Sequence, residues 1–241
     1  MKFVACLTLL LAAAAFSQDP SNILIYMDVS GGYGEAVVTA CNNLWPSCNV
    51  YPATGQPGGM YTQFNDALAT GPWDIVVVES WYADCDGLDW AGISSYYNGG
   101  GTLYVSTWEW TGGSSGQGVL GNDMGVTAYS NIQGGVIPHY AWDTGHPICD
   151  GISDWGWADP GLGILNCRFT VDSATPITGW TSSPSAGQAA LCVAEDGKSI
   201  ISGFTLAYAN EGVAIWENVL DFMWTGSPLE RTTWGEIKSS F

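Results

Sequence analysis

The stretch Trp73-Asp74-Ile75-Val76-Val77-Val78-Glu79 is the clearest strand signal in the sequence. It is β-branched and apolar without alternation, which indicates a strand buried on both faces, as in a parallel sheet. Similar apolar runs and helical patterns alternate on both sides of it. Before it we expect strand 22–28, helix 33–45, strand 48–51 and helix 60–69. After it we expect helix 88–97 and strand 102–107. This alternation predicts right-handed crossovers and a doubly wound, mostly parallel α/β sheet with helices on both faces.

The pattern changes after this first half. Residues 112–165 are rich in Gly, Trp and Asp, and we expect one short helix near 117–124 followed by an irregular insertion. Two apolar runs, 189–194 and 199–204, flank Asp196-Gly197, a dipeptide typical of a β-hairpin turn. A last amphipathic helix over about 212–224 would close the fold. The sequence therefore predicts one domain over 18–226 and a loosely ordered C-terminal tail over 227–241.

The N-terminus has the pattern of an export signal. Lys2 precedes an apolar run from Phe3 to Phe16, and the small-residue frame Ala15-Phe16-Ser17 suits cleavage before Gln18. The run is shorter than the roughly 20 residues that a membrane-spanning helix needs, and we find no later candidate for a membrane span. Residues 1–17 are thus predicted to be a signal peptide, and the mature protein to be secreted, extracellular or periplasmic.

The charge balance is strongly acidic. Without Lys2 the chain keeps 23 carboxylates and four basic residues, at positions 168, 198, 231 and 238. Nucleic acids and anionic membranes bind through clustered Lys and Arg, so both are excluded as partners. Neutral carbohydrate, cations and extracellular proteins remain possible partners, and an acidic surface that only keeps the protein soluble is the simpler interpretation.

Six cysteines follow the signal peptide, and an even number in an exported chain suggests disulfides. Cys41 and Cys48 lie on either side of a turn at Pro46, so we expect them to pair. Cys149 and Cys167 would close a longer loop and hold the insertion. The sequence has no C-x-x-C pair and only two histidines, His139 and His146, a pattern that argues against a structural zinc site. We interpret the histidines as ordinary loop residues, with a metal pair or proton shuttle as the alternative.

Several stretches resemble the class I glutamine amidotransferase-like superfamily, a flavodoxin-like α/β group. The resemblance covers residues 23–224 and rests on modest matches: 71–79 for the third strand, 99–106 for the glycine-led strand before the nucleophile, and 199–204 for the closing strand. A motif of exported, sugar-related families, such as the trehalose-utilisation-like proteins, resembles His146-Pro147-Ile148 followed by Gly151-Ile152.

The sequence departs from this family where catalysis would take place. Active members carry a nucleophilic cysteine in the turn after the fourth strand, where this chain has Ser106-Thr107-Trp108-Glu109-Trp110. They also carry a His–Glu pair after the closing strand, where this chain has Thr205-Leu206-Ala207-Tyr208. Nucleophilic acyl transfer needs a nucleophile and a base within hydrogen-bond reach. The resemblance therefore implies a divergent exported member that lacks the catalytic cysteine.

A second set of candidates lies at the carboxyl ends of the predicted strands, where open α/β sheets bind ligands. There we expect the carboxylates of Asp28, Glu79 and Glu109 to converge beside four aromatic residues, Trp81, Tyr82, Trp108 and Trp110. Aromatic faces stack on sugars, and carboxylates bind hydroxyls or act as acid and base. The alternative interpretation is that the carboxylates cap helices or bind backbone amides and that the tryptophans fill the core.

Asp84, Asp86 and Asp89 form a run that superficially resembles a calcium loop, although it lacks the full spacing and the distal glutamate. The alternative is a solvated loop whose last acid begins a helix.

Taken together, the residues favour an exported, non-catalytic amidotransferase-like domain that binds carbohydrate or a protein partner at the carboxyl edge of the sheet and needs no cofactor. One alternative is a glycan hydrolase that uses Glu79 and Glu109 as paired carboxylates, whose separation would then be about 5 to 10 Å. The other is a structural protein of the cell envelope.

Overall fold

The computed structural model describes residues 19–28, 35–54, 60–81, 85–108, 110, 116–132, 137–156 and 166–225. The predicted signal peptide and C-terminal tail lie outside these residues. Within them, no helix is both long and apolar enough to span a bilayer.

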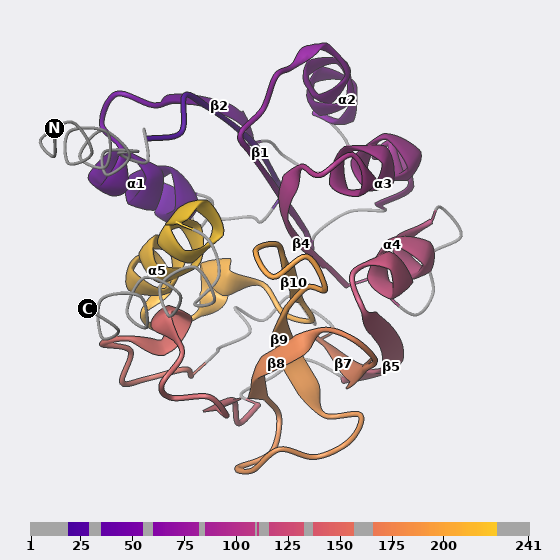
Figure 1. Cartoon of the computed structure of the whole chain (residues 1–241), viewed down its shortest axis with the longest axis vertical. Coiled ribbons are helices and arrows are strands. Elements are labelled where there is room, and N and C mark those ends of the chain that lie inside the picture. Colours follow the sequence, from indigo (N-terminus) through magenta and orange to yellow (C-terminus); the bar gives the residue numbers. More distant parts are fainter. Residues whose placement is uncertain are drawn as a thin grey trace, which may run out of the picture.

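A mixed sheet with a parallel part and an antiparallel extension runs through the centre of the molecule (Figure 1). Five strands form its parallel part, in the order β2-β1-β3-β4-β10: β1 (Asn22–Met27), β2 (Asn49–Thr54), β3 (Ile75–Ser80), β4 (Thr102–Thr107) and β10 (Ile200–Ser202). Every residue of β3 is buried, as its uninterrupted apolar pattern predicts. The predicted α/β class and parallel sheet are confirmed.

Helices cover both faces of this sheet (Figure 1). Helices α1 (Glu35–Leu44) and α5 (Gly212–Thr225) lie side by side on one face, which we call the α1/α5 face. Helices α2 (Tyr61–Thr70), α3 (Trp90–Asn98) and α4 (Gln117–Asp123) lie on the other, the α2/α4 face. Because side chains alternate along each strand, the sheet divides the core into two apolar clusters, one beneath each set of helices.

The second half of the chain is more regular than the sequence suggests. The short helix near 117–124 is present as α4, but strands β5 (Val126–Ile132) and β6 (Tyr140–Ala141) follow it within the predicted irregular insertion. Strands β7 (Asn166–Val171), β8 (Thr175–Gly179) and β9 (Ala189–Val193) complete an antiparallel extension, in which β9 joins β10 and β5 ends the sheet. Short 3-10 turns lie at Cys85–Gly87 (η1), Pro147–Cys149 (η2) and Leu206–Tyr208 (η3).

The two predicted disulfides are absent, since all six described cysteines are free thiols. Cys149 packs in the cluster under α1 and α5, whereas Cys167 packs in the cluster on the opposite face, so the sheet separates this pair. Cys41 and Cys48 lie on the same face, and burial raises the pKa of their thiols to about 12 and about 11. A thiol can pack as a small apolar group, and this packing accounts for the presence of cysteines that the sequence analysis expected to form disulfides.

Candidate functional site

The carboxyl edge of the parallel strands carries buried polar side chains in two layers, one on each face of the sheet. In the strand register Glu79 lies beside Met27 and Ser106, and Ser80 lies beside Thr107. Successive side chains alternate between the faces. Asp28 and Glu79 therefore point to opposite faces, and the expected convergence of these two carboxylates is wrong.

Asp28 belongs to the α2/α4 face and is only 2% exposed. Its Oδ1 accepts a 2.6 Å hydrogen bond from the backbone N–H of Trp81, and its Oδ2 accepts from the hydroxyls of Ser80 at 3.0 Å and Tyr26 at 3.2 Å. A carboxylate with this many donors is satisfied as an anion without a ligand. Asp28 thus ties β1 to the chain after β3, as in the interpretation that the carboxylates bind backbone amides.

Glu79 lies on the α1/α5 face, fully buried, beneath the turn η3. Its Oε1 accepts from the N–H of Leu206 at 2.5 Å and from the hydroxyl of Tyr104 at 3.3 Å, while Oε2 has no hydrogen-bond partner. Burial raises the pKa of Glu79 to about 8, although hydrogen bonds from Leu206 and Thr205 act against this shift. Glu79 is therefore protonated at neutral pH and holds η3 on the sheet.

The tryptophans of the expected aromatic rim are mostly core residues. Trp81 and Trp110 are each 3% exposed, and their ring N–H groups donate to Ser106 Oγ and to the carbonyl of Ser202. Trp110 also packs edge-on against Phe169. Trp108 is half-buried between the two clusters. Trp81 and Trp110 thus fill the core, as the alternative interpretation has it, while Tyr82 and Glu109 lie outside the described residues.

The acidic run after β3 contributes a helix cap. Asp89 Oδ1 accepts from the N–H of Gly92 and begins α3, as the alternative to a calcium loop predicts. Asp86 is exposed in η1, and Asp84 lies outside the described residues. Across the part of the chain that the structure describes, no three His, Cys, Asp or Glu side chains gather in a way that could hold a metal ion.

Both histidines have structural partners. His139 is buried among Trp155, Trp180 and Phe204, and its ring nitrogens bond the carbonyl of Trp155 and the hydroxyl of Thr178. Burial lowers its pKa to about 3, so it is neutral. His146 Nδ1 accepts from the N–H of Ile148, and burial lowers its pKa as well. The two side chains occupy separate environments, which agrees with their interpretation as ordinary histidines.

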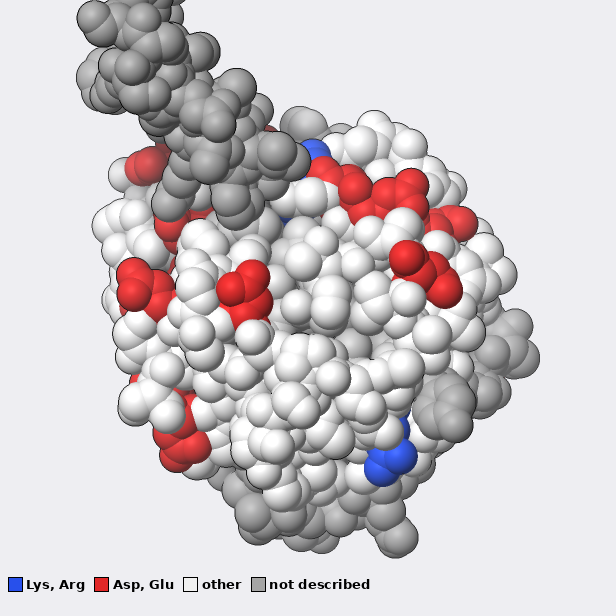
Figure 2. Space-filling model, turned by 60° about the horizontal axis from the view of Figure 1, so that its bottom comes forward, with Lys and Arg blue, Asp and Glu red and all other residues white. Residues whose placement is uncertain are grey.

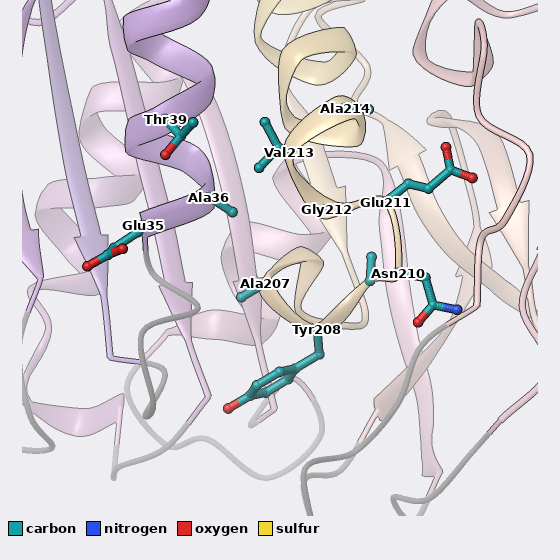
Figure 3. Close-up of a pocket in the computed structure, with 11 residues that line it drawn as sticks. Glu35, Ala36, Thr39, Ala207, Tyr208, Asn210, Glu211, Gly212, Val213 and Ala214 are labelled. Carbon is teal, nitrogen blue, oxygen red and sulfur yellow. The ribbon is translucent and has the colours of Figure 1, made fainter.

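An open pocket of about 720 Å³ lies at the carboxyl edge, where α1 and α5 begin next to η3. Figure 3 shows Ala36 and Thr39 of α1 across from Val213 of α5, with Tyr208 of η3 below them. Glu35 and Glu211, at the starts of the two helices, point away from each other to either side. The pocket thus has small apolar walls with a hydroxyl between them and carboxylates at its flanks.

A network of hydrogen bonds fixes the wall of this pocket formed by the start of α5. Glu211 Oε1 accepts from the hydroxyl and N–H of Ser153 and from the N–H of Asp154. These donors, the Ser153 hydroxyl first, hold the pKa of Glu211 below its usual range. Asn210 donates to Asp154 Oδ2, which lowers the pKa of that carboxyl. The pocket is therefore preformed on this side.

The pocket lies at the edge of the sheet where the sequence predicts a site, but residues other than the predicted ones line it. The pocket lining comes from the first turns of α1 and α5 and from η3, not from the strand ends themselves. The useful signal was the position of the two helices, since each follows a parallel strand and so begins at the carboxyl edge. Their adjacency depends on β10 lying beside β4, which the sequence does not show.

The charged side chains on the face that Figure 2 shows are mostly acidic. In that view, carboxylates lie along the upper and left parts of the molecule, and a basic side chain lies at the lower right. Anionic ligands are disfavoured at the pocket, because Glu35 and Glu211 flank it.

No family model matches the sequence, and no curated protein sequence matches it. Solved structures are similar in fold. A ThuA-like protein from Bacteroides uniformis aligns with a TM-score of 0.53 at 9% identity, over 87% of this chain and 95% of its own. The chain has the class I glutamine amidotransferase-like fold.

Two further structures align with this chain at low identity. A cold-adapted β-galactosidase from Rahnella sp. R3 aligns with a TM-score of 0.50 and 14% identity, and the match takes 88% of this chain but only 31% of the enzyme. A ThuA-like protein from Parabacteroides merdae aligns with a TM-score of 0.49 and 9% identity, over 87% of this chain and 91% of its own. At such identities the likeness concerns the fold alone.

In this amidotransferase-like fold the turn after β4 is occupied by hydroxyls that are already bonded. Ser106 Oγ donates to the carbonyl of Phe204 and accepts from the ring of Trp81. Thr107 Oγ1 lies 2.9 Å from the thiol of Cys85. Both hydroxyls are fully buried, and the described histidines bond elsewhere. The described part of this turn therefore offers no nucleophile activated by a base.

Proposed function

We propose that this protein is an exported, non-catalytic member of the amidotransferase-like superfamily that has lost the nucleophilic cysteine and binds a neutral carbohydrate. The ligand site is the pocket between the first turns of α1 and α5. The observation that carries the proposal is that this pocket is open and preformed at the carboxyl edge, while the side chains at the nucleophile position are buried and bonded.

The size and lining of the pocket suit a sugar. A volume of about 720 Å³ is in the range of small-molecule sites. The methyl groups of Ala36 and Val213 offer apolar contact to the faces of a sugar ring, and the Thr39 hydroxyl and Glu35 carboxylate are acceptors for its hydroxyls. Backbone N–H groups in the first turns of both helices add donors.

Hydrolysis by paired carboxylates receives less support. Glu79 is fully buried under η3 and is absent from the lining of the pocket. A general acid or nucleophile must reach the glycosidic bond, so Glu79 would need η3 to move away. Its partner Glu109 lies outside the described residues.

The proposal is tested by blocking the pocket with a large ring. Thr39 and Asn42 are both exposed on α1, but only Thr39 lines the pocket. We expect the mature protein to be retained by one or more neutral glycans on an array and in affinity electrophoresis. Thr39→Trp should abolish that retention, and Asn42→Trp, with the same ring one turn of helix away from the pocket, should leave it unchanged.

Two results would contradict the proposal. Equal binding by the wild type and both variants would mean that the ligand binds elsewhere. No retention by any neutral glycan, together with capture of a peptide or protein ligand that Thr39→Trp abolishes, would keep the pocket but replace carbohydrate by a protein partner.

A further inference from the structure

The turn η3 forms a wall of the pocket and is fixed at both of its ends. Before the turn, the carbonyl of Phe204 accepts hydrogen bonds from the hydroxyls of Ser106 and Ser202. After the turn, the backbone N–H of Asn210 donates to the carbonyl of Gly156 at 2.9 Å. A movement of η3 therefore takes place between Phe204 and Asn210.

The middle of the turn is held to the sheet by Glu79. The bond from the N–H of Leu206 to Glu79 Oε1 is 2.5 Å long. Two hydrogen bonds that close the turn itself are longer, 3.3 Å from the N–H of Ala207 to the Thr205 hydroxyl and 3.4 Å from the N–H of Tyr208 to the Thr205 carbonyl. Most N–H···O bonds measure about 2.9 to 3.0 Å. The turn thus depends on its contact with β3.

The surroundings of Glu79 favour its neutral form. Its side chain is fully buried, and among the described residues Oε2 has no hydrogen-bond partner. A buried negative charge without enough donors is costly, so an ionised Glu79 has to gain contact with water. Because η3 lies over this carboxyl, the turn has to shift for water to reach it. Burial accordingly raises the pKa of Glu79 to about 8.

The groups that face Glu79 from the surrounding strands and from α5 are neutral between pH 6 and 8. Met27 of β1 and Ser106 of β4 lie beside it in the strand register. The phenol of Tyr104, also from β4, donates to Oε1, and its ring packs against Trp216 of α5. Burial raises the pKa of this phenol well above its usual range.

The other titratable groups of this edge surround the pocket. Tyr208 of η3 and the carboxylates Glu35 and Glu211, at the starts of α1 and α5, line it. Asp28, at the end of β1, belongs to the other face of the sheet. All four are unchanged in a Glu79→Gln variant, so a comparison of this variant with the wild type isolates the effect of Glu79.

We propose that the protonation of Glu79 regulates the pocket: the neutral side chain holds η3 closed, and its ionisation lets the turn open, so that the ligand binds more weakly as the pH rises. Once hydrated, Glu79 has its ordinary pKa of 4.5. Opening therefore releases a proton, and between pH 6 and 8 it becomes about ten-fold more favourable with each pH unit. The ligand rests on the proposed function, whereas the opening of η3 can be measured without one.

Hydrogen exchange of the Leu206 amide in the mature protein, followed by nuclear magnetic resonance from pH 6 to 8, tests the opening. The protection factor already corrects for the intrinsic pH dependence of exchange. We expect it to fall about ten-fold per pH unit in the wild type and to stay constant in Glu79→Gln. Glu217 of α5 is not among the residues that line the pocket and accepts from Asn43. Glu217→Gln makes the same chemical change and should keep the wild-type slope.

The amide of Val77 provides the reference for global unfolding, because this residue is fully buried in the middle of β3. A local opening of η3 requires the Leu206 amide to be less protected than that of Val77 at pH 8. Equal protection of the two amides would overturn the proposal, since η3 would then open only when the whole protein unfolds. So would the same slope for Leu206 in the wild type and in Glu79→Gln.

Calorimetric titration with a retained neutral glycan at the same pH values tests the effect on binding. Wild-type affinity should fall between pH 6 and 8 in proportion to the fraction of molecules with η3 closed, and the affinity of Glu79→Gln should stay constant. Wild-type affinity that does not change with pH would overturn the regulation of the pocket. If no glycan is retained, the proposed function fails, and the exchange of Leu206 still decides whether Glu79 controls η3.

Discussion

Two carboxylates on neighbouring strands end in different environments on the two faces of one sheet. On the α2/α4 face Asp28 accepts from Tyr26, Ser80 and the backbone of Trp81. On the α1/α5 face Glu79 has one oxygen without a partner and a pKa raised to about 8. The comparison shows that position at the carboxyl edge does not make a residue part of a pocket, because both carboxylates serve the core and neither lines the pocket.

The largest effect is expected at Asp28. Asp28→Ala removes the acceptor for a buried N–H and two hydroxyls, and each buried donor left unsatisfied costs about 1 to 3 kcal/mol. We expect the free energy of unfolding to fall by about 3 kcal/mol or more. Urea denaturation followed by tryptophan fluorescence measures it. A loss below about 1 kcal/mol would mean that these hydrogen bonds do not hold the edge together.

A smaller effect distinguishes Glu79 by its dependence on pH. Between pH 6.5 and 8 the folded protein keeps Glu79 protonated, whereas the unfolded chain, with an ordinary pKa of 4.5, has it ionised. Unfolding therefore releases a proton, and stability should decrease by about 1 to 2 kcal/mol as the pH rises across this window.

The histidines act in the opposite direction at lower pH. Because burial lowers the pKa of His139 to about 3, stability is lost as the pH falls below 6.5, where the unfolded chain binds the proton first. Above pH 6.5 the contribution of the histidines fades, so from pH 6.5 to 8 the decrease caused by Glu79 is expected to be the larger effect. Denaturation curves at several pH values measure the slope, and a stability that rises with pH between 6.5 and 8 would show that Glu79 is ionised in the folded protein.

The smallest effect is expected for Glu79→Gln at pH 6. The glutamine oxygen can still accept from Leu206 N–H and Tyr104, and a neutral group replaces a neutral group. We expect a change within about 1 kcal/mol and a flat stability profile from pH 6.5 to 8. A loss as large as that of Asp28→Ala would remove the contrast between the two carboxylates.

The parts of the fold that the sequence predicts are those with an unbroken local pattern. The run before Glu79 could only be a strand buried on both faces. Pro176 in β8 and Arg168 in β7 both weaken the local strand signal. These two strands form because β8 pairs with β9 and β7 pairs with β5. Pairing with strands distant in the sequence, and not the local pattern, therefore determines β7 and β8.

The site was harder to predict because the face of a side chain depends on register. Asp28 and Glu79 both end a strand, but Glu79 pairs with Met27, so Asp28 is aligned with Ser80 on the other face. An offset of one residue between strands reverses the direction of every side chain. The aromatic content likewise did not reveal that Trp81 and Trp110 are core residues.

The most direct test of the account is a nuclear magnetic resonance titration of the mature protein with a retained neutral glycan. The account predicts that backbone amide shifts concentrate in the first turns of α1 and α5 and in η3, at Ala36, Thr39, Ala207 and Val213, and that the ring N–H of Trp110 does not move. Shifts centred on the turn at Ser106–Trp108, with the α1 and α5 residues unaffected, would contradict it.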